Sequence, residues 1–214
     1  MNTPEYKLLA GRPQPEHGMQ AANLPLIAED EAPPEVAKLY AHFRSRFGRS
    51  HVPGILQCFA THPPLLEHMM ALSESLLFSD GALNRRQKEM IATFISSDNR
   101  CAYCADSHGF FLRVHHGSQE LLDALLTCNL HTDAMTAAER ALLEFARQVN
   151  RAVENVGPQT MQRLREHGWT NLQLAETIHL TSLFATFNRV VTAFGLPSQG
   201  LLADANLLAT ESEP

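Results

Sequence analysis

The chain has 214 residues, of which 44% are hydrophobic and 19% are charged, and this composition describes an ordinary globular protein that is long enough to bury a real core. Its formal net charge is -6 and the sequence has no basic cluster, which argues against nucleic acid and anionic membrane surfaces as partners. We expect the partners to be proteins or small molecules.

Residues 1–30 show little hydrophobic periodicity and contain several prolines, so we expect an arm that lies across the domain or across a neighbouring subunit. The beginning of this segment is polar and lacks the apolar run of a secretory signal. No apolar run in the chain approaches the length that spans a bilayer. The sequence therefore predicts a cytoplasmic protein without a membrane partner.

From residue 31 onward the start and stop signals are those of helices. Paired prolines begin two predicted helices, of which the first ends at Gly48 and the second near Asp80. Asn84 and Gln87 form a capping-box pattern at the start of a helix that runs to about Ser97.

The next helix is predicted to begin at Asp98 or Asn99 and to end at Gly117. Ser118 begins a short helical segment after it. These two predictions place a helix across the region richest in reactive side chains.

Two longer helices are predicted in the last third of the chain. Thr136 and Glu139 form a second capping box, and the helix after them ends at Gly157. A short helix then reaches Gly168, and Thr170 caps the final helix. The expected buried stripes are Leu142, Phe145, Val149, Val153 and Val156 on the first long helix, and Leu180, Leu183, Phe184, Phe187, Val191 and Phe194 on the final one.

No segment alternates polar and apolar residues between hairpin turns, so the predicted fold class is all-α. The predicted organisation is an arm over 1–30, a helical domain over 31–200 and a loose tail over 201–214. A faint repeat relates residues 115–125 to residues 166–178, which is consistent with two similar helical units packed together.

The four cysteines fall into two kinds. Cys58 and Cys128 each stand alone among apolar residues, as buried unreactive thiols do. Cys101 and Cys104 belong to the stretch RCAYCADSHGFF, and in a reducing compartment such a pair more often serves metal binding or redox chemistry than a permanent disulfide. On the predicted helix these two cysteines and His108 share one face.

This spacing suits thiol chemistry. Residues three apart on a helix have Cβ atoms about 5 to 6 Å apart, which permits a reversible disulfide between Cys101 and Cys104. Thiols in the first turn of a helix can have strongly lowered pKa values. His108, one turn beyond Cys104, can accept its proton or stabilise its thiolate. On the preceding helix Glu89 can reach the edge of the same pocket, although a solvated carboxylate is an alternative interpretation.

Two other interpretations of the cysteine pair stay open. Zinc is one, but Cys101 and His108 are separated by about 10 Å along a helix, and the sequence has no second CxxC or HxxxH to complete four ligands. An inert thiol pair is the other. The spacing favours redox chemistry without a bound metal or cofactor.

Taken together, the motif is similar to that of a known family. Glu89, eleven further residues, Cys101-Ala-Tyr-Cys104 and then His108 resemble the E-x11-C-x2-C-x3-H signature of AhpD-like alkylhydroperoxidases, in the carboxymuconolactone decarboxylase superfamily. The resemblance covers about residues 83–126. The later stretch FNRVVTAFGLP is similar to the closing helix of the peroxidase-related branch.

The resemblance implies an all-helical protomer, an AhpD-like helical bundle, in a homo-oligomer that reduces peroxides without haem or flavin and is recycled by a dithiol such as a lipoylated protein. Carried across by position, it makes Cys104 the peroxidatic thiol, Cys101 the resolving thiol, His108 the base and Glu89 its partner in a proton relay. Members of the family can have a histidine just before the second cysteine, where this chain has Tyr103.

Two rival functions stay open: a carboxymuconolactone decarboxylase-like lyase, which the cysteine pair argues against because that branch lacks it, and a non-catalytic redox sensor. His179 and Asn188 on the final helix could face the pocket, but we interpret them as core residues. Core packing is also the leading interpretation, ahead of an apolar mouth for an organic hydroperoxide, for Phe94, Phe110, Phe111, Phe184 and Phe187.

Overall fold

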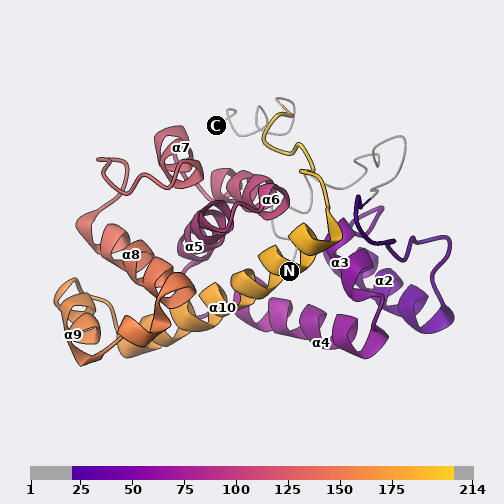
Figure 1. The fold of residues 1–214 in the computed structure, drawn as a ribbon, viewed down its shortest axis with the longest axis horizontal. Coiled ribbons are helices and arrows are strands. Elements are labelled where there is room, and N and C mark those ends of the chain that lie inside the picture. Colours follow the sequence, from indigo (N-terminus) through magenta and orange to yellow (C-terminus); the bar gives the residue numbers. More distant parts are fainter. Residues whose placement is uncertain (1–20, 205–214) are drawn as a thin grey trace. The chain divides into compact units, whose positions relative to one another are not determined.

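The structure is a computed structural model that describes residues 21–204. Figure 1 shows these residues as helices joined by connections without regular structure, and no strand occurs between residues 21 and 204. The all-α prediction is confirmed. Within the same residues, no helix combines the length and the apolar character needed to cross a membrane.

The described residues form two compact units. The first unit contains residues 21–75 together with Val190–Pro197. The second contains Leu76–Arg189 together with residues 198–204. The candidate site residues named above all belong to the second unit.

The first unit is built from α2, α3 and α4. Prolines stand at the start of α2 and α4, as predicted, and α2 ends at Gly48, whose backbone has a φ of 61°. Val36 and Tyr40 of α2 are buried, and the Tyr40 hydroxyl donates to the carbonyl of Ile27 at 2.8 Å. The bounds are Pro34–Phe47 for α2, Gly54–Phe59 for α3 and Pro63–Ser73 for α4.

Part of the predicted arm belongs to this first unit. The N–H groups of Ala22 and Asn23 donate to the carbonyls of Gly195 and Phe194 at 3.1 and 3.0 Å. The rest of the predicted arm, 1–20, and residues 205–214 of the predicted tail lie outside the described residues. The predicted domain boundaries therefore stay a prediction.

The second unit is organised around α5 (Arg85–Asp98). Most of α5 is buried because α6, α7 and α8 all pack against it (Figure 1). The other elements are η1 (Glu74–Phe78), α6 (Ala102–Val114), α7 (Gln119–Leu126), α8 (Ala137–Arg151), η2 (Val153–Asn155), α9 (Pro158–Glu166) and α10 (Asn171–Phe194). The first residues of η1, up to Ser75, and the last residues of α10, from Val190, belong to the first unit.

The predicted caps at the starts of these helices are formed. Asn84 Oδ1 accepts from the N–H of Gln87 at 2.9 Å, and Gln87 Oε1 accepts from the N–H of Asn84 at 3.0 Å. Thr136 and Glu139 form the same reciprocal pair at the start of α8. Ser118 caps α7, and Thr170 with Gln173 caps α10.

The predicted apolar stripe of α8 is wrong at its end. The helix stops at Arg151, and Val153 in the next turn is 62% exposed. Ala152 leaves helical geometry with a φ of -152°, and the Gln148 side chain donates to the carbonyl of Asn155 at 2.7 Å. The hydrophobic period continues in the sequence past the point where the backbone turns away.

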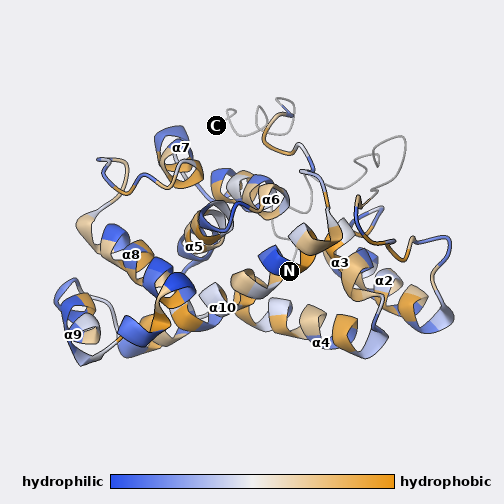
Figure 2. Ribbon diagram, in the orientation of Figure 1, coloured by the Kyte–Doolittle hydropathy of each residue, from blue (hydrophilic) through white to orange (hydrophobic). Residues whose placement is uncertain are grey.

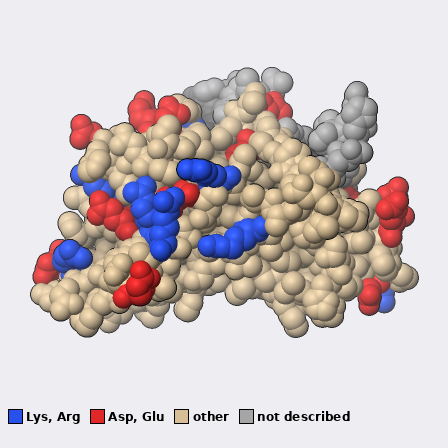
Figure 3. All heavy atoms as spheres, in the orientation of Figure 1, with Lys and Arg blue, Asp and Glu red and all other residues tan. Residues whose placement is uncertain are grey.

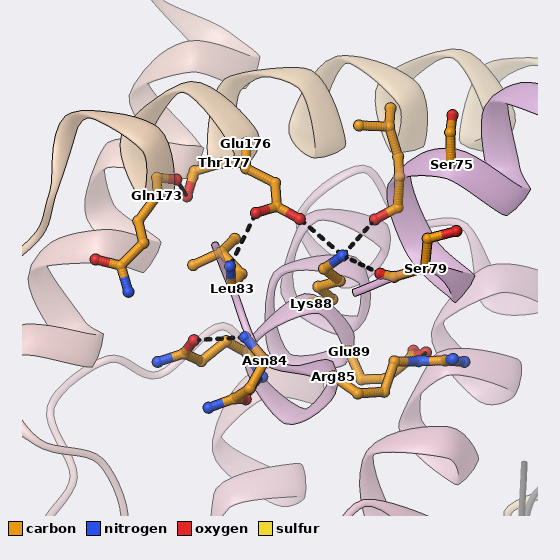
Figure 4. A network of polar contacts seen from close by, with 12 residues as sticks. Ser75, Ser79, Leu83, Asn84, Arg85, Lys88, Glu89, Gln173, Glu176 and Thr177 are labelled. Atoms are coloured by element: carbon orange, nitrogen blue, oxygen red, sulfur yellow. Dashed lines mark hydrogen bonds and ion pairs between the residues drawn. The ribbon is translucent and has the colours of Figure 1, made fainter. Parts of the chain in front are cut away.

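A buried lysine fastens α5 to the segment that precedes it and to α10 (Figure 4). Lys88 Nζ donates to the carbonyls of Leu76 and Ser79 at 2.8 and 2.9 Å, and it lies 2.7 Å from Oε1 of Glu176. The other oxygen of Glu176 accepts from the N–H of Leu83 at 2.8 Å. The buried Lys88 and the half-buried Glu176 therefore both have partners, as charges shielded from water require.

The surfaces of the outer helices are of ordinary composition. α8 and α9 carry both hydrophilic and hydrophobic residues, as helices with one face in a core do (Figure 2). On the face drawn in Figure 3, acidic and basic side chains are mixed among many uncharged ones. This mixture agrees with a sequence that lacks a basic cluster.

Candidate functional site

The connection between α5 and α6 places the cysteine pair. Arg100 has a left-handed backbone with a φ of 58°. Its N–H donates to the carbonyl of Ser97 at 2.9 Å, and the N–H of Cys101 donates to the carbonyl of Ser96 at 2.8 Å. These are the two hydrogen bonds of a Schellman motif, which ends α5. Helix α6 then begins at Ala102, with Cys101 as its N-cap residue.

The predicted start of this helix at Asp98 or Asn99 is therefore wrong. Asp98 is the last residue of α5 and Asn99 is its C-cap. The usual stop signal, a glycine in the left-handed position, is absent because Arg100 occupies that position. Cys101 has an extended backbone and lies outside α6, so the three predicted side chains do not share one helical face.

Cys104 and His108 do share one face of α6. They are four residues apart, which places their Cβ atoms about 6 Å apart on a helix. Cys104 lies in the first turn, where backbone N–H groups and the helix dipole favour an anion. Cys101 and Cys104 are each 2% exposed, and both are thiols in the structure.

Glu89 of α5 is fully buried and contacts His108. Its Oε2 lies 2.7 Å from Nδ1 of His108, and its Oε1 accepts from Nε of Arg85 at 2.7 Å. The interpretation of Glu89 as a solvated carboxylate is wrong. The packing of α5 against α6 brings an acid and an imidazole together that are 19 residues apart in the chain.

The charges around Glu89 decide its ionisation. Burial raises the pKa of the Glu89 carboxyl, but Arg85 and His108 outweigh burial and lower the pKa to about 2. Glu89 is therefore an anion at neutral pH. Because a carboxylate only accepts hydrogen bonds, Nδ1 of a neutral His108 carries the proton and Nε2 has the lone pair. Nε2 is the nitrogen that can act as a base.

Two aromatic rings hold the imidazole in place. The ring centroids of Phe184 on α10 and His108 are 4.6 Å apart, and the angle between the two ring planes is 87°. The corresponding values for Phe111 and His108 are 5.7 Å and 68°. Both arrangements are edge-to-face contacts, which aromatic pairs prefer. Of the predicted aromatic set, Phe94, Phe110, Phe184 and Phe187 are buried and Phe111 is half-buried.

Side chains of α8 hold the end of α5 just before the cysteine pair. Asp98 Oδ2 accepts from Nε of Arg151 at 2.6 Å and from Nδ2 of Asn150 at 3.1 Å. Arg147 Nε lies 3.3 Å from the other oxygen of Asp98. The turn that positions Cys101 is therefore anchored by ion pairs as well as by backbone hydrogen bonds.

Asn188 of α10 also supports this turn. It is buried, its Nδ2 donates to Oγ of Ser96 at 3.0 Å, and its Oδ1 accepts from Nδ2 of Asn99 at 3.0 Å. The interpretation of Asn188 as a core residue is confirmed. His179 on the same helix is exposed, so the same interpretation is wrong for His179.

The chain after α10 returns to α6. The carboxylate of Asp106 accepts from the N–H groups of Leu201 and Leu202 at 2.9 and 3.0 Å, and Gln199 Nε2 donates to Oγ of Ser107 at 2.5 Å. Leu201 is buried. Residues 199–202, which reach into the start of the predicted tail, therefore pack on α6.

The two single cysteines, Cys58 and Cys128, differ in chemical character from Cys101 and Cys104. Cys58 is buried, and burial raises its pKa to about 12, as expected of an unreactive thiol. Cys128 is half-buried, and burial raises its pKa as well. Among residues 21–204, no group of three or more His, Cys, Asp or Glu side chains has an arrangement that could hold a metal ion.

Sequence reasoning misses Arg85, which contacts the buried carboxylate directly. The signal that could have found it is the spacing, because Arg85 precedes Glu89 by four residues and such pairs are neighbours on a helix. Nothing in the sequence distinguishes this pair from an ordinary exposed i, i+4 ion pair. Burial alone makes the difference.

Comparison with known proteins adds a family match. A model of the carboxymuconolactone decarboxylase family matches residues 63–148. The matched segment contains Glu89, Cys101, Cys104 and His108. A search among curated proteins found no match.

Several solved structures resemble most of the chain. An uncharacterized peroxidase-related protein from Silicibacter sp. TM1040 is 26% identical, with a TM-score of 0.73 over 92% of this chain and 97% of that one. A peroxidase-related protein from Ralstonia eutropha JMP134, described as an alkylhydroperoxidase AhpD core, is 24% identical, with a TM-score of 0.75 over 90% of this chain and 97% of that one. The debrominase Bmp8 in complex with 2,3,4-tribromopyrrole is 17% identical, with a TM-score of 0.68 over 90% of this chain and 98% of that one. The last two show likeness of fold alone.

Proposed function

This chain belongs to the AhpD and carboxymuconolactone decarboxylase superfamily, and from that premise we propose that it is a thiol-dependent peroxidase that reduces organic hydroperoxides with Cys104 and Cys101. The observation that carries the proposal is the contact between His108 Nδ1 and the buried Glu89 carboxylate at 2.7 Å, one helical turn from Cys104. This is the nucleophile, base and orienting group of covalent catalysis.

In the first step Nε2 of His108 takes the proton of the Cys104 thiol, while Glu89 holds the other side of the imidazole. The thiolate sulfur attacks one oxygen of the hydroperoxide and the O–O bond breaks. Cys104 becomes a sulfenic acid. The leaving alkoxide receives the proton from His108 and departs as an alcohol.

In the second step the thiol of Cys101 attacks the sulfenic sulfur, which forms a Cys101–Cys104 disulfide and releases water. An external dithiol, such as a lipoylated protein, then reduces the disulfide by two exchange reactions and is itself oxidised to a disulfide. The cycle uses no haem, flavin or metal. It requires a reducing compartment, which fits a cytoplasmic protein.

The test is peroxide turnover with purified variants and a dithiol reductant. Cys104→Ser is expected to abolish the oxidation of the protein by cumene hydroperoxide. Cys101→Ser is expected to oxidise once and to stop as a sulfenic acid on Cys104 that a dimedone probe traps. Cys128→Ser, which changes a half-buried thiol elsewhere, serves as the control and should turn over like the wild type.

The proton relay predicts a different kind of defect. His108→Ala and Glu89→Gln should slow sulfenate formation by roughly 100-fold or more, the usual contribution of general acid–base catalysis, while diamide should still drive disulfide formation. Full peroxide turnover in both cysteine variants would contradict the proposal. A disulfide that forms without turnover would favour a redox sensor, and lactone decarboxylation that survives loss of both cysteines would favour the lyase.

We also propose that the protein is a homo-oligomer. The support lies in α4, which is rich in apolar residues (Figure 2). Only Leu66 of this helix is buried, while Leu65 and Leu72 are each 40% exposed. Leu65 and Leu72 are seven residues apart and so lie on one face of the helix, and contiguous apolar surface marks sites of protein association. Light scattering at micromolar concentration should give a mass of two or more times 23.8 kDa. A monomer would contradict this part of the proposal.

A further inference from the structure

Arg85 contacts the oxygen of Glu89 that His108 does not use. Its Nε donates to Oε1 at 2.7 Å, and Nδ1 of His108 lies 2.7 Å from Oε2. We propose that Arg85 is a positioning residue of the peroxidase site, which keeps Glu89 an anion and so keeps Nε2 of His108 available as the base. The effect of Arg85 on the rate of peroxide reduction rests on the proposed function, whereas its effect on the protonation of His108 does not.

Arg85 is held rigidly enough for this role. Its guanidinium carbon lies 4.9 Å from the centre of the Phe78 ring, at a distance suited to a cation–π contact. Its side chain is only 16% exposed, and the Glu89 side chain is fully buried. An ion pair that is shielded from water in this way is screened much less by salt than an exposed pair.

The other charges around α5 have partners of their own. Lys88 pairs with Glu176 of α10, as Figure 4 shows, and Arg86 pairs with Glu139 of α8. On α8, Arg147 and Arg151 contact Asp98. On α6, the carboxylate of Asp106 accepts from the N–H groups of Leu201 and Leu202. On α7, Glu120 and Asp123 are exposed.

The sign of the effect follows from the sum of the charges. With Arg85 present, the cation and the Glu89 anion cancel while His108 is neutral. Without the cation, a buried negative charge is left, and burial favours neutralising it. The pair of Glu89 and His108 then takes up a proton at higher pH, so His108 stays protonated over a wider range and cannot accept the proton of Cys104.

The experiment is an NMR titration of His108 with isotope-labelled histidine, its signal assigned by its loss in His108→Gln. In Arg85→Gln the titration midpoint should rise by about one pH unit or more, the usual size of the effect of a neighbouring charge. Arg85→Lys keeps the charge and should return the midpoint toward the wild-type value. Arg86→Gln is the matched control, since Arg86 pairs with Glu139 instead, and it should leave the midpoint unchanged.

A second measurement needs no variant. At a pH above the midpoint, the ring nitrogen shifts of wild-type His108 should report a proton on Nδ1 and none on Nε2. A proton on Nε2 would overturn the proposal, as would an unchanged midpoint in folded Arg85→Gln.

The kinetic readout is the rate of sulfenate formation against pH in the Cys101→Ser background. Arg85→Gln should move the rising limb of this profile to higher pH by the same amount as the NMR midpoint, and the plateau should stay near its original height. A uniform loss of rate at every pH would contradict the role, because a merely structural defect has that effect. If the wild type fails to react with peroxide at all, the proposed function falls while the titration result stands.

Discussion

Buried hydroxyl groups on α10 differ in whether they have a partner. Oγ1 of Thr177 donates to the carbonyl of Gln173 at 2.8 Å, which satisfies the hydroxyl within the helix. Oγ1 of Thr181, one turn later, is fully buried and has no hydrogen-bond partner among residues 21–204. A buried polar group without a partner destabilises the folded state, since it has lost its hydrogen bond to water.

We therefore expect opposite effects from the same substitution at these two positions. Thr181→Val should raise the free energy of unfolding by about 1 kcal/mol, because valine has the same shape and no hydroxyl to desolvate. Thr177→Val should lower it by about 1 kcal/mol, because a satisfied hydrogen bond is lost. Urea unfolding of both variants tests this. Equal losses in both would show that the Thr181 hydroxyl has a stabilising partner after all.

At the scale of elements, Lys88 holds the segment before α5 in place. Its ammonium group joins two backbone carbonyls and Glu176, so η1, α5 and α10 meet at one buried cation. Gly81 lies against the same carboxylate: a Cβ there would be 2.2 Å from Oε1 of Glu176. This charged cluster therefore helps to hold the segment that leads into α5.

Removal of the buried cation should be strongly destabilising. Lys88→Met leaves Glu176 without its charged partner, and breaking a buried ion pair in this way costs about 3 to 5 kcal/mol. Lys38→Met is the control, because Lys38 is exposed on α2 and such a change is within about 0.5 kcal/mol. Thermal and urea unfolding measure both. A loss below about 1 kcal/mol for Lys88→Met would mean that the cluster contributes little.

At the scale of the whole molecule, carboxylates that are paired in the folded state link stability to pH. The pKa of Glu89 falls from about 4.5 to about 2 on folding, and those of Glu139 and Glu176 are lowered as well by their basic and backbone partners, against the effect of burial. A group whose pKa is lowered in the folded state stabilises it above the pKa of the unfolded state. That contribution is lost as the pH falls through the folded pKa.

The protein should therefore lose stability in acid chiefly between about pH 4.5 and pH 2, and Glu89 should contribute on the order of 3 kcal/mol to this loss. Urea midpoints measured across this range test the expectation. Glu89→Gln should have a shallower slope than the wild type, whereas Glu67→Gln, which changes an exposed carboxylate on α4, should keep the wild-type slope. The same slope in Glu89→Gln and the wild type would contradict the assignment.

Much of this architecture could be predicted from the sequence because its signals are local. A capping box such as Asn84 with Gln87 needs only residues three apart, so the starts of α5 and α8 are confirmed where the pattern predicted them. The common face of Cys104 and His108 is equally local, since it depends only on the helical repeat. For the same reason the all-α fold class followed from helix start and stop signals and from the lack of alternating segments between hairpin turns.

The rest depends on which helix lies against which, and only the tertiary structure decided it. The start of α6 was misplaced because Arg100 occupies a left-handed position that usually signals itself by glycine. His179 was misplaced because a histidine within an apolar helix is equally compatible with either face. Glu89 and Arg85 look like an ordinary exposed ion pair in sequence, and it is the packing of α6 against α5 that buries the carboxylate and presents it to His108.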